Sequence, residues 1–172
     1  EIEEPRGPKV LESDFYESVG EWLKSELDEV TDVVAVGGAG FRTKWGTPDV
    51  LGVYKPLASN PVKFPIEIVS AEVKVNPQEA ITAFGQAAAY RLFSSKTYIA
   101  MTSRIAEDDL SRLESLCMSF GVGLVLFDLY PKSPNYRIRM RAQRFSADMF
   151  YVNELADRLK TQEPETFERL FR

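Results

Sequence analysis

The first regular pattern along the chain is helical. Ser13 is a residue of N-cap type, and the apolar positions after it recur three and four residues apart, which predicts a helix over residues 14–28. The apolar face of this helix would consist of Phe15, Val19, Trp22, Leu23 and Leu27.

Three short apolar runs of strand type follow, and glycine and proline separate them. The first run is interrupted by the glycine-rich segment 37–40, and a proline-rich loop over residues 55–65 separates the other two. Their lengths and their β-branched residues are typical of strands. The runs cover residues 32–36 with a resumption over 41–44, then 49–54 and 66–75.

The second half of the chain alternates helical and strand patterns. Asn76-Pro77 is typical of a helix start and Gly121 of a helix end, and Ser103 and Ser146 are further candidate caps. We therefore expect helices over 77–93, 104–120 and 147–160, strands over 97–101 and 122–129, an additional strand or extended arm over 137–145, and a short helical tail after residue 160.

The resulting order is α-β-β-β-α-β-α-β with a C-terminal strand and helix, and it predicts an α/β fold. We expect a mixed sheet of four to five strands flanked by helices. The chain divides into an N-terminal arm (1–12), a core domain (13–130) and a C-terminal basic strand and helical extension (131–172) that packs on the core.

The composition restricts the chemistry that is available. The chain of 172 residues, 44% of them hydrophobic, is long enough for one domain with a hydrophobic core. It has no histidine, which excludes histidine-based triads and zinc sites with histidine ligands. Its one cysteine, Cys117, excludes an internal disulfide, and no apolar run is long enough to span a membrane. We therefore expect a cytoplasmic protein with no membrane partner.

Two short polar segments lie within the strand patterns, namely Pro48-Asp49 and Glu72-Val73-Lys74. Side chains alternate between the faces of a strand, so Glu72 and Lys74 point the same way. If the two strands are neighbours, two carboxylates and one ammonium group meet at one edge of the sheet, and Mg²⁺ prefers such oxygen ligands. Two alternatives stay open: Pro48-Asp49 as an ordinary turn, and Glu72 with Lys74 as part of a solvated strand face with an ion pair.

At these residues the chain resembles the PD-(D/E)XK nuclease superfamily, which has the restriction-endonuclease-like fold. The resemblance implies that Asp49, Glu72 and the backbone carbonyl of Val73 hold Mg²⁺ or Mn²⁺, and that Lys74 is the catalytic lysine. It also implies a metal-dependent DNA endonuclease or exonuclease of restriction or repair type, which hydrolyses phosphodiester bonds. By analogy with nucleases of this size, we consider a homodimer.

Two further segments are similar to parts of related nucleases. Residues 14–19 (Asp-Phe-Tyr-Glu-Ser-Val) are similar to the N-terminal helix of archaeal junction resolvases, which implies that Glu17 is a metal ligand; the alternative is a solvated surface charge. Gln86 and Tyr90, four residues apart on one helix face, resemble the additional motif of RecB-type nucleases. This implies that Gln86 holds the substrate or Lys74 and that Tyr90 contacts nucleic acid. The alternative is a glutamine on an exposed flank and a tyrosine in the core.

The charge distribution bears on a nucleic-acid partner. The net charge of −5 argues against such a partner, but basic residues gather between positions 130 and 147, where acidic ones are absent. Arg42 and Lys44 flank the expected metal site and are candidates for phosphate contacts or plain surface cations. The row Arg137, Arg139 and Arg141 would share one strand face, where like charges need a partner: phosphates, acidic residues of this chain, or a second subunit.

A second class of function stays open, namely a non-catalytic nucleic-acid-binding or assembly module that retains the nuclease fold. The acidic composition favours it. The intact set of Asp49, Glu72 and Lys74 argues against it. A third, less favoured reading is a metal-dependent hydrolase of a small phosphate ester or nucleotide.

Overall fold

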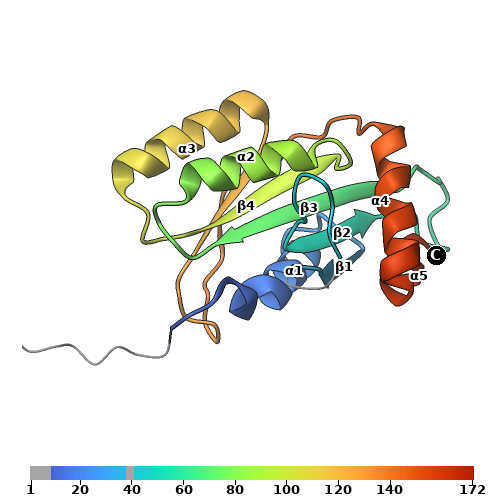
Figure 1. Cartoon of the computed structure of the whole chain (residues 1–172), viewed down its shortest axis with the longest axis horizontal. Helices are drawn as coiled ribbons and strands as arrows, with labels where there is room; N and C mark the ends of the chain where they lie inside the picture. Colours follow the sequence, from blue (N-terminus) through green and yellow to red (C-terminus); the bar gives the residue numbers. More distant parts are fainter. Residues whose placement is uncertain (1–8, 38–40) are drawn as a thin grey trace, which may run out of the picture.

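The fold is built on one mixed six-stranded sheet (Figure 1), and the computed structural model describes residues 9–37 and 41–172. The strands are β1 (Asp32–Ala35), β2 (Val50–Tyr54), β3 (Glu67–Lys74), β4 (Lys96–Thr102), β5 (Gly123–Phe127) and β6 (Arg137–Met140). They lie side by side in chain order. The first three are mutually antiparallel, β3, β4 and β5 are parallel, and β6 is antiparallel to β5.

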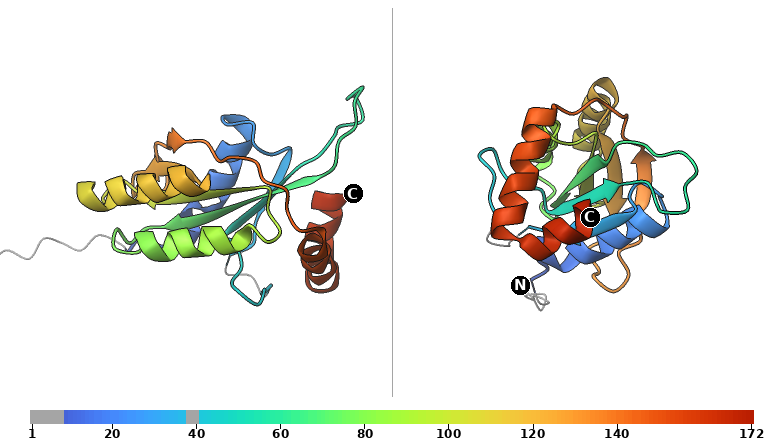
Figure 2. Two further views of the ribbon diagram at one scale, coloured as in Figure 1. Left: turned by 90° about the horizontal axis from the view of Figure 1, so that it is seen from above. Right: turned by 90° about the vertical axis from the view of Figure 1, so that its right-hand side faces the viewer.

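Helices cover both faces of the sheet and one end of it. The helices are a 3₁₀ turn η1 (Glu12–Phe15), α1 (Tyr16–Ser25), α2 (Ala80–Tyr90), α3 (Glu107–Phe120), α4 (Met149–Gln162) and α5 (Pro164–Phe171). As Figure 2 shows, α1 lies on one face and α2 on the other, while α4 and α5 lie at the end of the molecule. α5 contacts β1 and β2, the antiparallel edge of the sheet.

The two faces follow from the alternation of side chains along each strand. In β3, Val69 and Val73 belong to the core beneath α1, whereas Ile68 belongs to the core beneath α4 and α5. In β4, Ile99 and Met101 pack against α2 and α3. The even-numbered positions of β3 therefore lie on the face that α2 covers.

The predicted element order and the α/β class are confirmed, but the sheet has six strands rather than four to five. The additional strand is β6, which the sequence left open as a strand or an arm. It pairs with β5 through Leu126 opposite Arg137 and Val125 opposite Ile138, with a register shift next to Leu124. The expected resumption of the first strand over 41–44 is not found, because these residues form a loop.

Several helix boundaries differ from the prediction because polar side chains take other partners. Asn76 accepts a hydrogen bond from the Gln78 amide at 3.0 Å, which forms a local turn, and α2 begins only at Ala80. Ser103 donates to Asp128 at 2.7 Å instead of capping α3. The C-cap at Gly121 is confirmed, with a left-handed φ of 67°.

The two ends of the described chain belong to the fold. Val10 packs against the core beneath α1, and Glu12 lies in η1, so part of the expected arm is structured; residues 1–8 lie outside the described ranges. Leu155 and Leu159 of α4 and Leu170 of α5 are buried in one cluster with strand residues. Among the described helices, none combines the length and apolarity that a membrane crossing requires.

Candidate active site

The register of β2 and β3 brings Asp49 and Glu72 together. Val50 pairs with Ala71, so Asp49, one residue before β2, lies opposite Glu72. The Asp49 amide donates to the Ala71 carbonyl at 3.1 Å, and the Val73 amide donates to Asp49 Oδ2 at 2.8 Å. Both carboxylates are buried, with Asp49 7% and Glu72 3% exposed. They lie on the face that α2 covers.

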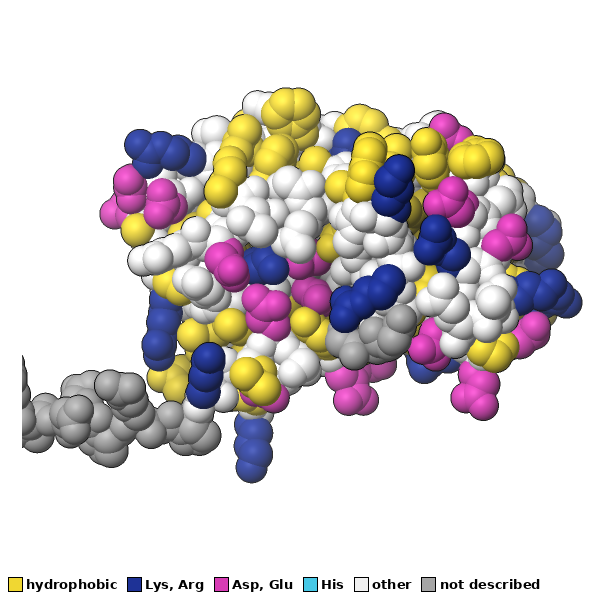
Figure 3. Space-filling view, in the orientation of Figure 1, with side chains coloured by type: hydrophobic (Ala, Val, Ile, Leu, Met, Phe, Trp, Pro, Cys, Tyr) yellow, Lys and Arg dark blue, Asp and Glu magenta, His cyan; other side chains and the backbone are white. Residues whose placement is uncertain are grey.

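Lys74 occupies the next position on the same face of β3. Its Nζ lies 3.1 Å from Glu72 Oε1 and 3.8 Å from Glu12 Oε1. The structure therefore brings Asp49, Glu72 and Lys74 together, and it adds Glu12 from η1. In Figure 3, acidic side chains gather around a basic one on the surface between α2 and α1.

Two tyrosines lie against the carboxylates. Tyr90 donates to Glu72 Oε2 at 2.6 Å, and its oxygen also lies 3.1 Å from the Thr47 carbonyl oxygen. Tyr16, the first residue of α1, lies beside Asp49, and its hydroxyl lowers the pKa of that carboxyl. Burial and the neighbouring carboxylates raise the pKa of both phenols, so both remain protonated donors. Tyr90 is buried and its hydroxyl positions Glu72, and its predicted contact with nucleic acid stays a prediction.

Burial and mutual repulsion make the two carboxylates hard to ionise together. Burial, and then the charge of Asp49, raise the pKa of Glu72 to about 7, although Tyr90 and Lys74 oppose the rise. Burial also raises the pKa of Asp49, although the Val73 amide, Tyr16 and Lys74 each lower it. Burial alone would lower the pKa of Lys74, but its acidic neighbours outweigh this and raise it. One cation thus faces more than one carboxylate, and a further cation would relieve the repulsion.

Glu12, rather than Glu17, is the N-terminal carboxylate that faces this cluster. Glu17 is exposed and lines a hollow on α1 together with Glu21 and Arg169. Glu12 is partly buried, and this burial raises its pKa. The charge of Lys74 lowers the pKa of Glu12 and the charge of Asp49 raises it, but the net shift is upward. The sequence analysis missed Glu12 and Tyr16. No spacing rule marks Glu12, because it lies in the 3₁₀ turn η1 before α1 begins at Tyr16.

Gln86 lies one turn before Tyr90 on the same side of α2, next to the buried residues Ala83 and Ala87. Its side-chain oxygen is buried and accepts no hydrogen bond from any residue in the described ranges. A buried acceptor without a partner is costly unless water, an ion or a ligand satisfies it. The predicted role of Gln86 in binding a ligand therefore stays a prediction, and its free oxygen is the observation that favours it.

The predicted phosphate contacts divide into two groups. Arg42 and Lys44 are exposed on the loop before β2. In contrast, the arginine row on β6 and just after it is neutralised by the chain itself. Its ion pairs are Arg137 with Asp128 (3.0 Å), Arg139 with Glu114 (2.6 Å) and Arg141 with Glu29 (3.1 Å). These three arginines therefore need no phosphate to balance their charge.

The donor set fits a hard divalent cation that keeps water ligands. Within residues 9–37 and 41–172, no three Asp, Glu or Cys side chains converge as a ready metal cluster. Mg²⁺, however, is often held by only one or two carboxylates together with water and substrate phosphate. Asp49 and Glu72 meet that requirement, because a carboxylate offers about four lone-pair sites and their hydrogen bonds use only some. The side chain of Val73 lies in the opposite core, so only its main-chain carbonyl could contribute.

Gly37 packs so closely on Asp49 that Gly37→Ala should displace this carboxylate. An added Cβ would lie 2.7 Å from Asp49 Oδ1, 2.7 Å from a Tyr16 ring carbon and 2.9 Å from Asp49 Cα. The backbone contact cannot be relieved by a rotamer change. We expect Mn²⁺ affinity, measured by calorimetry, to fall by about tenfold or more, with about 1–3 kcal/mol lost in the free energy of unfolding.

Gly85→Ala is the matched control for this substitution. No atom lies within 4 Å of a Cβ added at Gly85, which is on the exposed side of α2. Alanine should stabilise the helix by up to about 1 kcal/mol and leave Mn²⁺ affinity unchanged. Equal metal affinity in the two variants would show that Asp49 is not a ligand.

Comparisons of this chain with protein-family models, with curated proteins and with solved structures gave no significant match. No family is therefore shown by similarity, and the functional interpretation depends on the geometry of the Asp49, Glu72 and Lys74 cluster.

Proposed function

We propose that this chain is a metal-dependent deoxyribonuclease of the PD-(D/E)XK type, which hydrolyses phosphodiester bonds in DNA. The observation that carries the proposal is the convergence of Asp49, Glu72 and Lys74 on one buried face at the edge of β2 and β3. A buried cluster with excess carboxylate charge, one lysine and strongly shifted pKa values is typical of catalytic sites.

The chemistry of the cluster favours hydrolysis by water. Its side chains are carboxylates, one ammonium group and phenols, and the phenols are held protonated. Asp49 and Glu72, with the Val73 carbonyl, would hold Mg²⁺ or Mn²⁺. When bound, such an ion would lower the pKa of a coordinated water and polarise a phosphate oxygen.

The protein groups would orient the reactants around this position. Lys74 Nζ, anchored by Glu72, would donate to the attacking water or to a phosphate oxygen as negative charge develops. Tyr90 and Tyr16 would fix the carboxylates by donating to them, as partners of metal ligands commonly do. Gln86 would accept a hydrogen bond with its free oxygen.

The second candidate is the non-catalytic module, and one observation favours it. Lys74 and Tyr90 each already contact one oxygen of Glu72, so this carboxylate has partners within the chain. In that case the site would be a structural ion pair and would show little affinity for metal.

Calorimetric titration with Mn²⁺, followed by DNA cleavage assays with Mg²⁺, separates the two candidates. The nuclease should bind Mn²⁺ in the micromolar to millimolar range, and Asp49→Asn should weaken binding by at least tenfold and abolish cleavage. Asp109→Asn, which removes the same charge from an exposed position on α3, should change neither. No Mn²⁺ binding by the wild type, or equal binding by Asp49→Asn, would support the module.

A further inference from the structure

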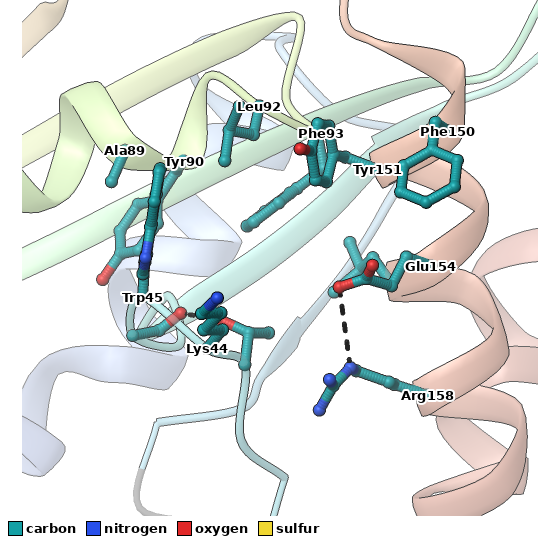
Figure 4. A pocket seen from close by; sticks show the side chains of 13 residues that line it. Lys44, Trp45, Ala89, Tyr90, Leu92, Phe93, Phe150, Tyr151, Glu154 and Arg158 are labelled. Atoms are coloured by element: carbon teal, nitrogen blue, oxygen red, sulfur yellow. Dashed lines mark hydrogen bonds and ion pairs between the residues drawn. The ribbon is translucent and has the colours of Figure 1, made fainter.

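A pocket of about 280 Å³ adjoins the cluster and has a different chemistry. It lies between the loop Thr43–Gly46, the C-terminal end of α2 and the first turns of α4 (Figure 4). Water occupies about 30 Å³ in the liquid, so the pocket has room for a ring system rather than for a single ion.

Tyr90 forms the wall between the pocket and the cluster. Its ring lines the pocket, while its hydroxyl donates to Glu72 at 2.6 Å. Gly46 lies beside the Tyr90 hydroxyl, since a Cβ added at Gly46 would be 4.0 Å from that oxygen. A group seated in the pocket is therefore separated from the proposed metal ligands by one phenol ring.

Five of the thirteen residues that line the pocket are aromatic, and two of these five are largely exposed. Trp45 is 65% exposed and Phe150 is 69% exposed, and they come from opposite sides of the pocket. Phe93 and Tyr151 complete the aromatic lining. Exposed aromatic faces of this kind are the surfaces on which nucleic-acid bases stack in proteins that bind single strands.

The charged residues at the pocket favour a nucleotide over an apolar peptide as its ligand. Lys44 lines the pocket, is exposed and forms no ion pair within the part of the chain that the structure describes. Arg42 is exposed two residues before it, and Arg158 on the pocket wall pairs with Glu154 at 3.9 Å and donates to the Arg42 carbonyl at 3.3 Å. Lys44 and Arg42, which unlike the row on β6 form no ion pair within the described part of the chain, are placed to receive phosphate.

We propose that this pocket binds an unpaired base of a DNA strand, with the adjoining phosphates directed to Lys44 and toward the metal site. This inference rests on the proposed function and narrows its substrate to DNA with a single-stranded, frayed or flipped segment. In an intact duplex the bases are stacked on each other and cannot enter such a pocket without being extruded.

Tryptophan fluorescence tests the inference without requiring catalysis. The chain has two tryptophans, so Trp22→Phe leaves Trp45 as the only emitter. Titration of this variant in EDTA with a single-stranded oligothymidylate should quench its emission. A duplex of the same length should reach the same quenching only at a DNA concentration at least tenfold higher. Absence of quenching, or equal response to the duplex, would overturn the proposal.

Alanine variants then identify the stacking side chains. Trp45→Ala and Phe150→Ala should each weaken single-strand binding, measured by anisotropy of a labelled oligonucleotide, by about tenfold. Tyr130→Ala is the control, because Tyr130 is 64% exposed next to Lys132 but lies in the β5–β6 turn. Affinity unchanged in both pocket variants would contradict base binding. Base binding would also be contradicted if, without DNA, the Trp45 emission changed with protein concentration, because a second copy of the chain would then occupy the pocket.

The two proposals fail separately in these experiments. If the wild type cleaves no DNA, while Glu72→Gln still binds single strands with quenching of Trp45 emission, the pocket proposal is retained and the nuclease proposal is rejected. Cleavage by the wild type, with Trp45→Ala and Phe150→Ala cutting single-stranded and duplex DNA as the wild type does, would retain the nuclease and reject the pocket.

Discussion

Replacing Lys74 by alanine should lower the rate of DNA cleavage by at least two to three orders of magnitude. Lys74 is the cation in contact with Glu72, at 3.1 Å, and it also lies 3.8 Å from Glu12. Without it, no ammonium group remains beside the proposed water and phosphate positions. Single-turnover cleavage with Mg²⁺ above saturation measures the chemical step and separates it from metal binding.

The same substitution also removes the partner of a buried carboxylate, so its effect on folding must be measured independently. Removing one member of a buried ion pair commonly costs about 3–5 kcal/mol, and protonation of Glu72 would lessen this cost. Lys96→Ala is a control for the loss of a buried ion pair, because Lys96 on β4 pairs with the buried Glu29 at 2.9 Å. Arg141 also pairs with Glu29, at 3.1 Å, so this variant should destabilise the protein less than Lys74→Ala and should retain cleavage in the folded fraction. Cleavage by Lys74→Ala at the wild-type rate would reject the mechanism.

Strand alternation places Glu72 and Lys74 on one face from the sequence alone, because that step is local. Asp49 joins them only if β2 and β3 are neighbours, and their antiparallel register, with Asp49 opposite Glu72, meets that condition. The helical spacing of Gln86 and Tyr90 likewise predicts that they share a face. What these residues do chemically stays a prediction until the metal and cleavage assays are made.

The contacts that the sequence did not reveal depend on tertiary packing. Glu12 reaches the cluster because η1 turns the chain just before α1, and no periodic pattern marks that turn. The arginines on and after β6 find Asp128, Glu114 and Glu29, which belong to three different parts of the chain. Trp45 and Phe150 meet at one pocket although more than a hundred residues separate them. Residue type and spacing cannot report such meetings.

The stability of the metal-free protein should fall as pH rises from about 4.5 to about 7. The pKa of Glu72 is about 7 in the folded chain against an ordinary 4.5, so the folded state holds a proton that the unfolded state releases. The stability contributed by this proton is complete below the ordinary pKa and is lost as pH rises through the folded one. The expected loss is about 3 kcal/mol, measured by urea unfolding in EDTA across this window.

Two changes should abolish or reverse this trend. Glu72→Gln should flatten the curve over the window, whereas Glu67→Gln should not, because Glu67 is on the same strand but pairs with Arg144 at 3.0 Å. Saturating Mn²⁺ should make stability rise with pH, because the metal binds the ionised carboxylate and competes with the proton. A Glu72→Gln curve that keeps the wild-type slope would show that another group titrates. If the stability falls with pH as expected for Glu72 but Mn²⁺ does not change this dependence, Glu72 has a structural role and does not bind the metal.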